Sequence, residues 1–448
     1  KGDTLFGMKR FALQGPWVRH FMNEWYWHKL LRYSGLIALR YDFVDVTVNG
    51  KHLPIYAIEE NFEKRLIENN HLREGPIFKA HLTPLMTYKN GSMLPYLKAI
   101  DTYQASKYSQ DIEFMKLVQS AESKIEAYRQ GDLPFSKVFD VNKMSKLLAL
   151  SDLVGSNFAL SYSRESAMDP RSLVARYNTL AYTNSRFYYN PITSLIEPIA
   201  YDSETNLGAL STKLNLIGAG RKFIDPKNAD SNWTWPLVVF RDKVLFKRYI
   251  ESLEEVSDKS FISKFYVEIE KEAQEKLKLL HRSFPYYESN KKEVLYKNQE
   301  FIKKQLQPQK SLNSYFDGGC MDEGLLCLDI ANIHIFPVEI LGISLDGNNV
   351  IKPLRETILQ AKRIEDIEPI FSAQDTIKES VLKEVKTLAN SLLPMVPIVN
   401  AKINKTPQSK TFPYLEYEKV KFRIPEELKW THDLIPRLRV ISRVFGAR

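Results

Sequence analysis

The sequence predicts an α+β protein, in which a strand-rich first segment and a helical second segment are followed by a β-rich third segment. Strand-like patterns and a tight Asn-Gly turn dominate residues 1–85. Apolar residues recur at helical spacing through much of residues 97–306. Short apolar runs separated by turn residues follow a change in composition at residues 307–315.

The first segment begins with a strand-like run at residues 5–14, and a helix is predicted over residues 18–33. Gly35 follows this helix, where a C-cap glycine is common. The helix carries apolar side chains at helical spacing, among them Phe21, Trp25 and Leu31. His20 and His28 are eight residues apart on it, further than the spacing that metal ligands prefer, so we expect helix-face residues.

A hairpin is predicted around Asn49-Gly50, between an alternating strand that ends near Val48 and a second strand at residues 53–58. A type I′ turn needs positive φ at both central residues, and Asn-Gly adopts it at little cost. A short helix at residues 62–70 and a strand at residues 75–79 complete the segment.

The second segment contains a long apolar-periodic run at residues 137–160 and an insertion-like stretch at residues 164–183. A strand, an Asn190-Pro191 turn and a returning strand then lead to Asp202. Amphipathic helices are predicted over residues 240–306. The domains expected are therefore residues 1–306 and a β-rich accessory module of residues 307–448, a candidate for truncation at Arg448.

The net charge of +9 favours a generally basic surface, because acidic and basic residues are interspersed along the chain. A nucleic-acid-binding protein is the lowest-ranked hypothesis, since charge alone suggests it. Cys320 and Cys327 form no zinc motif. We expect two buried small apolar side chains there and leave a single disulfide open.

No apolar run is long enough for a transmembrane helix. The first residues contain neither an initiator Met nor the apolar core of a signal peptide, and they read as the middle of a strand pattern. We expect that the natural N-terminus, with any secretory signal, lies upstream.

Phosphoryl transfer needs a cation on the phosphates, a carboxylate that fixes this cation, and an oxygen ligand for Mg²⁺. Lys9 on a strand, Glu24 on a helix and Asp202 after a downstream strand occur in the order that protein kinases use. None of the familiar kinase, P-loop, zinc-protease or serine-hydrolase motifs accompanies them.

The stretches GMKRFALQGP, LIALRYDFVDVTVNGKHLPIYAIEE, REGPIFK and NSRFYYNPITSLIEPIAYD resemble, in this order, segments of the CotH family of atypical, kinase-like proteins. The resemblance covers about 90 residues and frames roughly residues 1–240. It implies a bilobal kinase-like domain, with a small strand-rich lobe at residues 1–85 and a helical lobe at residues 86–306. It also implies a bacterial protein that binds ATP with Mg²⁺ or Mn²⁺ and phosphorylates serines of secreted or envelope proteins.

The resemblance implies the following site residues. Lys9 and Lys79 would contact the nucleotide phosphates, Glu24 would pair with Lys9, and Glu59 would lie near the adenine. Asn184 and Asp202 would hold the metal. The partner would be a protein substrate or a coat or envelope protein, in the cell envelope or outside the cell.

One departure from the family pattern affects catalysis. The position of the family's catalytic Asp holds Phe158 beside Asn157, and Asp152 lies six residues earlier as the candidate base. The Asp-aromatic-Asp ending is replaced by Asp202-Ser203-Glu204. The alternative hypothesis is therefore a catalytically degenerate CotH-like scaffold, a pseudokinase, in envelope or coat assembly.

Overall fold

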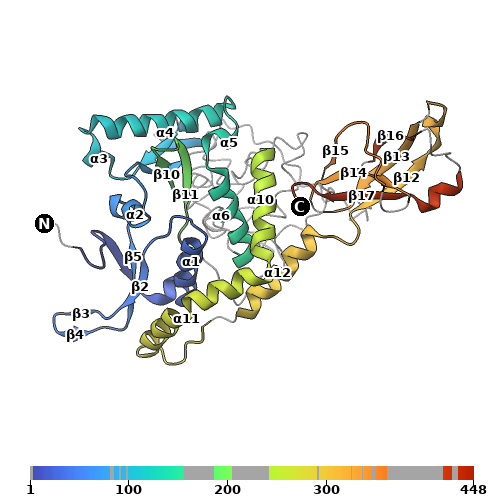
Figure 1. Cartoon of the computed structure of the whole chain (residues 1–448). Helices are drawn as coiled ribbons and strands as arrows, with labels where there is room; N and C mark the ends of the chain where they lie inside the picture. Colours follow the sequence, from blue (N-terminus) through green and yellow to red (C-terminus); the bar gives the residue numbers. More distant parts are fainter. Residues whose placement is uncertain are drawn as a thin grey trace, which may run out of the picture.

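The computed structural model describes residues 4–80, 85–89, 92–96, 99–155, 186–203, 242–289, 292–323, 325–334, 336–345, 349–360, 417–425 and 432–448. Helices and small antiparallel sheets alternate along these segments, which confirms the α+β prediction (Figure 1). The helices are α1 (Met22–Tyr33), α2 (Lys64–Asn69), α3 (Ala105–Tyr108), α4 (Ile112–Gln130), α5 (Phe135–Val138), α6 (Val141–Val154), α10 (Lys243–Ser257), α11 (Lys259–His281) and α12 (Lys292–Leu306).

The first sheet has the order β1–β5–β2, so the strand after the Asn-Gly turn lies in the middle. Its strands are β1 (Phe11–Gln14), β2 (Tyr41–Val44) and β5 (Tyr56–Glu60). The turn joins the short strands β3 (Thr47–Val48) and β4 (Lys51–His52). Asn49 and Gly50 have φ of 50° and 77°, which confirms the predicted positive-φ pair.

Two boundaries differ from the sequence prediction. The first strand begins at Phe11 rather than at residue 5. The helix begins at Met22, because a 3₁₀ turn, η1 (Pro16–Arg19), occupies its predicted start. His20 and Phe21 then have positive φ and turn the chain into α1. These two backbone conformations are costly for residues with side chains, and apolar periodicity does not signal them.

The second sheet has the order β11–β10–β6–β9 and forms next to the first. Its strands are β6 (Ile77–Ala80), β9 (Ile100–Thr102), β10 (Arg186–Asn190) and β11 (Leu195–Ile199), and a separate hairpin pairs β7 (Leu85–Lys89) with β8 (Ser92–Tyr96). Gly75 precedes β6 at a point where its backbone passes close to the backbone of β10. A Cβ atom there would lie 2.4 Å from the Tyr189 carbonyl oxygen, so the position requires glycine.

The main hydrophobic core lies among α1, α6, α10, α11 and the two sheets. It is rich in large aromatic side chains that are almost fully buried, including Trp25, Phe78, Phe139, Phe246 and Tyr249. Such side chains bury the most apolar area per residue and dominate the energetics of a core. The helices and both sheets are therefore joined through one continuous apolar cluster.

Residues beyond α12 form two three-stranded sheets whose inner faces share a separate apolar cluster. Their orders are β12–β13–β16 and β15–β14–β17. The strands are β12 (Leu312–Asp317), β13 (Leu325–Asn332), β14 (Val338–Ser344), β15 (Thr357–Leu359), β16 (Glu418–Arg423) and β17 (Arg439–Val444), with the 3₁₀ turns η5 (Gly318–Glu323) and η6 (His432–Arg437). This part is β-rich over its described residues, as the sequence predicts.

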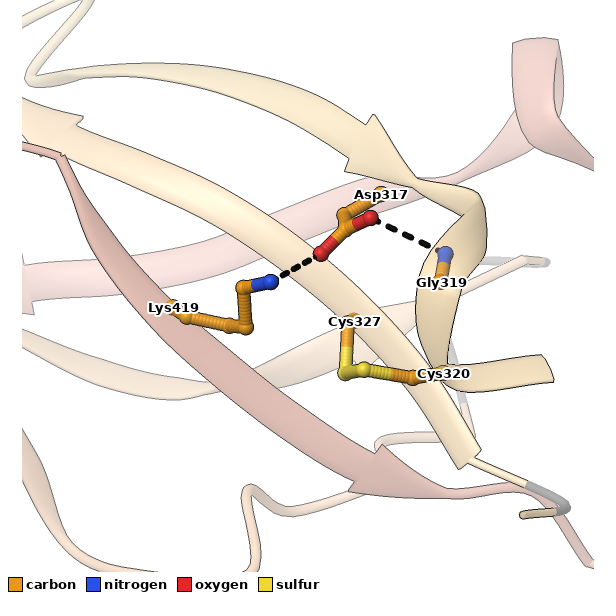
Figure 2. Close-up of a disulfide and its surroundings, with 5 residues drawn as sticks. All are labelled: Asp317, Gly319, Cys320, Cys327 and Lys419. Atoms are coloured by element: carbon orange, nitrogen blue, oxygen red, sulfur yellow. Dashed lines mark hydrogen bonds and ion pairs between the residues drawn. A yellow bond between two sulfur atoms is a disulfide. The ribbon is translucent and has the colours of Figure 1, made fainter. Parts of the chain in front are cut away.

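Cys320 of η5 and Cys327 of β13 form a disulfide, with their Cα atoms 5.8 Å apart (Figure 2). The expectation of two buried thiols is therefore wrong, although both side chains are buried. The turn η5 folds back beside the start of β13, which brings the two sulfurs together. Asp317 supports this turn by accepting a hydrogen bond from the Gly319 amide at 2.9 Å and by pairing with Lys419 (Figure 2).

The C-terminal sheets also contact the helical part. The ring of Phe246 in α10 lies 6.3 Å from Phe336 and 6.2 Å from Phe445, measured between ring centroids. Val444, at the end of β17, belongs to the main core. The apolar core thus continues across the predicted boundary at residues 306 and 307, and the division into domains stays a prediction.

Replacing Leu253 tests the α10 packing. Leu253 is fully buried in the main core, so Leu253→Ala should lower the free energy of unfolding by about 2–5 kcal/mol through the cavity it leaves. Urea unfolding measures this change. The control Val267→Ala, at a side chain that is 76% exposed, should stay within about 0.5 kcal/mol of the wild type. Equal losses in the two variants would contradict the packing described.

Candidate functional site

Glu24 of α1 is fully buried, and the end of the second sheet supplies its hydrogen-bond donors. The backbone amide of Asp202 donates to its Oε1 at 2.7 Å, and that of Ser203 donates to Oε2 at 2.9 Å. The Ser203 hydroxyl also donates to Oε2, at 2.9 Å. A carboxylate with three such donors is held in its charged form. These bonds join two parts of the chain that are 178 residues apart.

Glu59 of β5 lies next to Glu24 and is also buried. Gln14 of β1 donates a hydrogen bond from Nε2 to Glu59 Oε2 at 3.0 Å. A guanidinium nitrogen of Arg19 lies 4.0 Å from the same oxygen. The other oxygen, Oε1, has no hydrogen-bond partner among the residues that the structure describes.

Asp202 follows β11 and has a positive φ of 55°, which Asp tolerates better than most residues. This backbone conformation directs two successive amides at Glu24. The Asp202 carboxylate forms an ion pair with Arg19, which comes from η1. Arg19 therefore contacts carboxylates from both sheets.

His28 lies one helical turn after Glu24 and faces the same cluster. Its Nε2 is 3.2 Å from Glu24 Oε1, and its ring stacks on Tyr41 with centroids 5.8 Å apart. Neither ring nitrogen has a well-aligned hydrogen bond to a described residue. The Tyr41 hydroxyl is likewise buried without a partner there.

The pKa values of the two glutamates are shifted in opposite directions. Burial raises the pKa of Glu24, but the adjacent imidazole of His28 and the hydrogen bonds from Ser203 outweigh it, so the net shift is downward. Burial dominates at Glu59 and raises the pKa of that carboxyl, to which the charge of Glu24 adds. Burial and these same two carboxylates hold the pKa of Tyr41 well above its usual range. The cluster therefore has an excess of negative charge near Glu59.

The contacts recorded for Glu24 include neither of the two predicted phosphate lysines. Lys9 is exposed and makes no ion pair within the part of the chain that the structure describes, so the contacts of Glu24 do not include it. Arg19 is the cation beside the carboxylates instead. Lys79 of β6 is half-buried and pairs in register with Asp101. Burial, together with the charge of Arg186, lowers the pKa of Lys79.

Asp152 lies near the end of α6 and is buried, with 2% of its surface exposed. It accepts a hydrogen bond from the hydroxyl of Tyr249 in α10. Burial, together with the charge of Asp152, raises the pKa of Tyr249 well above its usual value. Asn184, the second predicted metal ligand, lies outside the described residues, as do Asn157 and Phe158.

Sequence reasoning missed Arg19, His28, Gln14 and Tyr41 as members of this cluster. His28 had a usable signal, because a spacing of four residues places it on the same face of the helix as Glu24. Arg19 and Gln14 had none of comparable strength. Their contacts depend on how η1 and β1 are oriented against β5 and residue 202.

The family model described as CotH kinase protein matches residues 1–307. The chain belongs to the CotH kinase family. The matched residues contain Lys9, Glu24, Glu59, Lys79, Asp152, Asn184 and Asp202, whose roles stay predictions. No curated protein matches the chain. Within its described residues, this family member has no helix with the length and apolar character needed to cross a bilayer.

Replacing Glu24 should change how stability depends on pH. Its folded-state pKa lies below the ordinary value of 4.5, so the charged carboxylate stabilises the fold above about pH 4.5. This contribution is lost as the pH falls through the folded-state pKa. Glu24→Gln should cost about 3 kcal/mol at pH 7 and progressively less below pH 4.5. Thermal unfolding in EDTA between pH 3 and 7 measures the difference.

The control for this experiment is Glu270→Gln, on the exposed face of α11, which should follow the wild type at every pH. A Glu24→Gln deficit that stays constant down to pH 3 would contradict the assigned shift.

Tyr249→Phe tests the role of Asp152 in packing. The variant removes one donor from a buried carboxylate and should cost about 1–3 kcal/mol in urea unfolding. Tyr286→Phe is the control, because that side chain is 96% exposed and should leave the midpoint unchanged. Identical midpoints for both variants would argue against a stabilising Tyr249–Asp152 bond.

Proposed function

We propose that this chain is an atypical protein kinase of the CotH type, which transfers the γ-phosphate of ATP to serine hydroxyls of secreted or cell-envelope proteins. The observation that carries the proposal is the set of hydrogen bonds between Glu24 and the backbone of residues 202 and 203. In protein kinases a lysine paired with a helix glutamate and a downstream metal-binding aspartate must both be in place for phosphoryl transfer. Here the hydrogen bonds bring the helix glutamate beside Asp202, the proposed counterpart of that aspartate. Family membership favours ATP and a divalent metal in general.

The residues around Asp202 suit a nucleotide-bound metal and a phosphate. Asp202 offers the carboxylate oxygen that Mg²⁺ or Mn²⁺ prefers, and Asn184 is the proposed second ligand. Arg19 Nε is buried without an acceptor among the described residues, so a phosphate oxygen could accept its hydrogen bond. The bound nucleotide and metal supply the phosphoryl group and neutralise its charge.

Other residues have proposed roles in this reaction. Arg19 would exchange part of its ion pair with Asp202 for the nucleotide, and Glu24 would hold the backbone of residue 202 in position. Lys9 and Lys79 are the proposed further phosphate contacts, and Glu59 would face the nucleotide pocket. Asp152 is the proposed base, a role that requires its carboxylate to become accessible to a serine hydroxyl.

The disulfide between Cys320 and Cys327 supports a location outside the reducing cytoplasm. Disulfides persist in oxidising compartments and are rare where glutathione and thioredoxin keep thiols reduced. The substrates proposed are therefore proteins of the cell envelope or the cell exterior.

The alternative is a catalytically degenerate scaffold in envelope or coat assembly. The burial of Asp152 under Tyr249 favours it, because a base must lie within hydrogen-bond reach of the proton that it accepts. A scaffold would keep the fold and the Glu24 contacts but would transfer no phosphate.

A thermal-shift titration with ATP and Mg²⁺ tests nucleotide binding. At a ligand concentration of 100 times Kd, the full chain should gain about 2.7 kcal/mol, which corresponds to a rise in Tm of roughly 2–4 °C. Asp202→Asn keeps the size and the tolerance for positive φ but removes the charge, so it should abolish the shift. Asp45→Asn, at a side chain that is 54% exposed, should keep it.

An absent shift for the wild type, or equal shifts for both variants, would contradict the assignment of Asp202. Transfer of radiolabelled phosphate from ATP to a serine-rich protein then separates the two functions. Transfer that depends on Asp202 supports the kinase, whereas nucleotide binding without transfer supports the scaffold.

A further inference from the structure

A second group of ligand atoms lies beside Asp202 but does not include it. Glu24, His28 and Glu59 each direct one ligand atom into a space where all three atoms are within 4.8 Å of one another. Two of these residues come from consecutive turns of α1 and the third from β5. Their exposed fractions are 0%, 4% and 7%, so solvent screens the group little.

Unsatisfied polar atoms point to a ligand in this space. Nδ1 of His28 and Oε1 of Glu59 have no hydrogen-bond partner among the described residues. Nε2 of His28 lies 3.2 Å from Glu24 Oε1, but the two are not aligned as a good hydrogen bond. A buried polar atom left without a partner costs roughly 1–3 kcal/mol. An imidazolium paired with Glu24 would use Nε2 but would leave Nδ1 and Glu59 Oε1 unsatisfied.

The spacing of the ligand atoms suits a metal ion. His28 Nε2 and Glu24 Oε1 are 3.2 Å apart. Two ligands at the 2.0–2.1 Å typical of zinc are separated by about 2.9–3.4 Å in octahedral or tetrahedral geometry. Glu59 offers the third ligand atom, within 4.8 Å of the other two, and its Oε1 has no hydrogen-bond partner among the described residues.

Supporting hydrogen bonds already orient the two carboxylates. Gln14 donates to Oε2 of Glu59 and leaves Oε1 available. The amides of Asp202 and Ser203 fix the Glu24 carboxylate. Metal-binding carboxylates in proteins are typically held by such outer hydrogen bonds, which set their direction.

The charge and the surroundings agree with a dication. Arg19 is the permanent cation that the described contacts place near Glu59, and it is also paired with Asp202. Two buried carboxylates close together repel each other unless a cation lies between them. A cavity of about 150 Å³ borders the group on the side of His28 and Tyr41.

We propose that Glu24, His28 and Glu59 hold a resident transition-metal dication of the Zn²⁺ class, separate from any nucleotide-bound Mg²⁺ at Asp202. An imidazole in the ligand set favours Zn²⁺ over Mg²⁺ and Ca²⁺, which prefer oxygen ligands alone. The ion joins α1 to β5 and, through Glu24, to residues 202 and 203. It acts as a structural link and requires no nucleotide.

Metal content and thermal stability of the full chain test this proposal. The protein is treated with EDTA, reloaded with Zn²⁺ and desalted. Inductively coupled plasma mass spectrometry should then find about one zinc per chain. Zn²⁺ should raise Tm by several degrees, whereas Mg²⁺ should not. Both effects should be lost in His28→Ala and in Glu59→Gln. The second variant keeps the shape of the side chain and so stays informative if the first fails to fold.

The control His52→Ala removes an exposed histidine from β4 and should keep the bound zinc. Asp202→Asn should also keep it, so failure of the metal site and failure of the nucleotide site can be told apart. Less than a tenth of an equivalent of zinc in a folded wild type would overturn the proposal. Equal zinc content in Glu59→Gln and the wild type would overturn it as well.

Discussion

The architecture of the site depends on one buried carboxylate, that of Glu24. Removing a charged carboxylate from water costs several kcal/mol unless donors replace its hydration. Here the donors are the two amides and the hydroxyl of residues 202 and 203, which reach it because Asp202 has a positive φ. The helix that carries Glu24 and the strand that leads to Asp202 are therefore fixed to each other, and both sheets are positioned with them.

The approach of the chain to α1 determines which cation meets these carboxylates. His20 has a left-handed backbone conformation and Phe21 another conformation of positive φ, each of which costs of order 1 kcal/mol or more. They reverse the chain after η1 and leave Arg19 between Glu59 and Asp202. Such strain persists because the surrounding core, with Met22 and Trp25 fully buried, fixes the start of the helix. Arg19 is thus the cation that the described contacts place beside these carboxylates, and the phosphate role of Lys9 stays a prediction.

Helix α11 makes ion pairs with both the first sheet and α1. Lys276 pairs with Asp42 of β2 at 2.6 Å, and Lys29 of α1 pairs with Glu272 at 2.6 Å. These pairs are partly exposed, so each contributes little free energy. The two ion pairs instead help to set the relative orientation of α11, α1 and β2, whose apolar faces already form the core. The side chains of Glu24, His28 and Glu59 meet where α1 packs against β5.

The sequence by itself determined the α+β class, the Asn49-Gly50 hairpin and the strands around Asp202, because local backbone preference and apolar periodicity specify them. Its family resemblance agrees with the match over residues 1–307. Only the tertiary structure decided that Glu24 meets residues 202 and 203, that Arg19 is the nearby cation, and that the two cysteines are bonded. The contacts of Glu24 and Arg19 with residues 202 and 203 join parts of the chain that are distant in sequence, whereas the disulfide depends on how η5 folds back beside β13. No pattern of neighbouring residues encodes such distances.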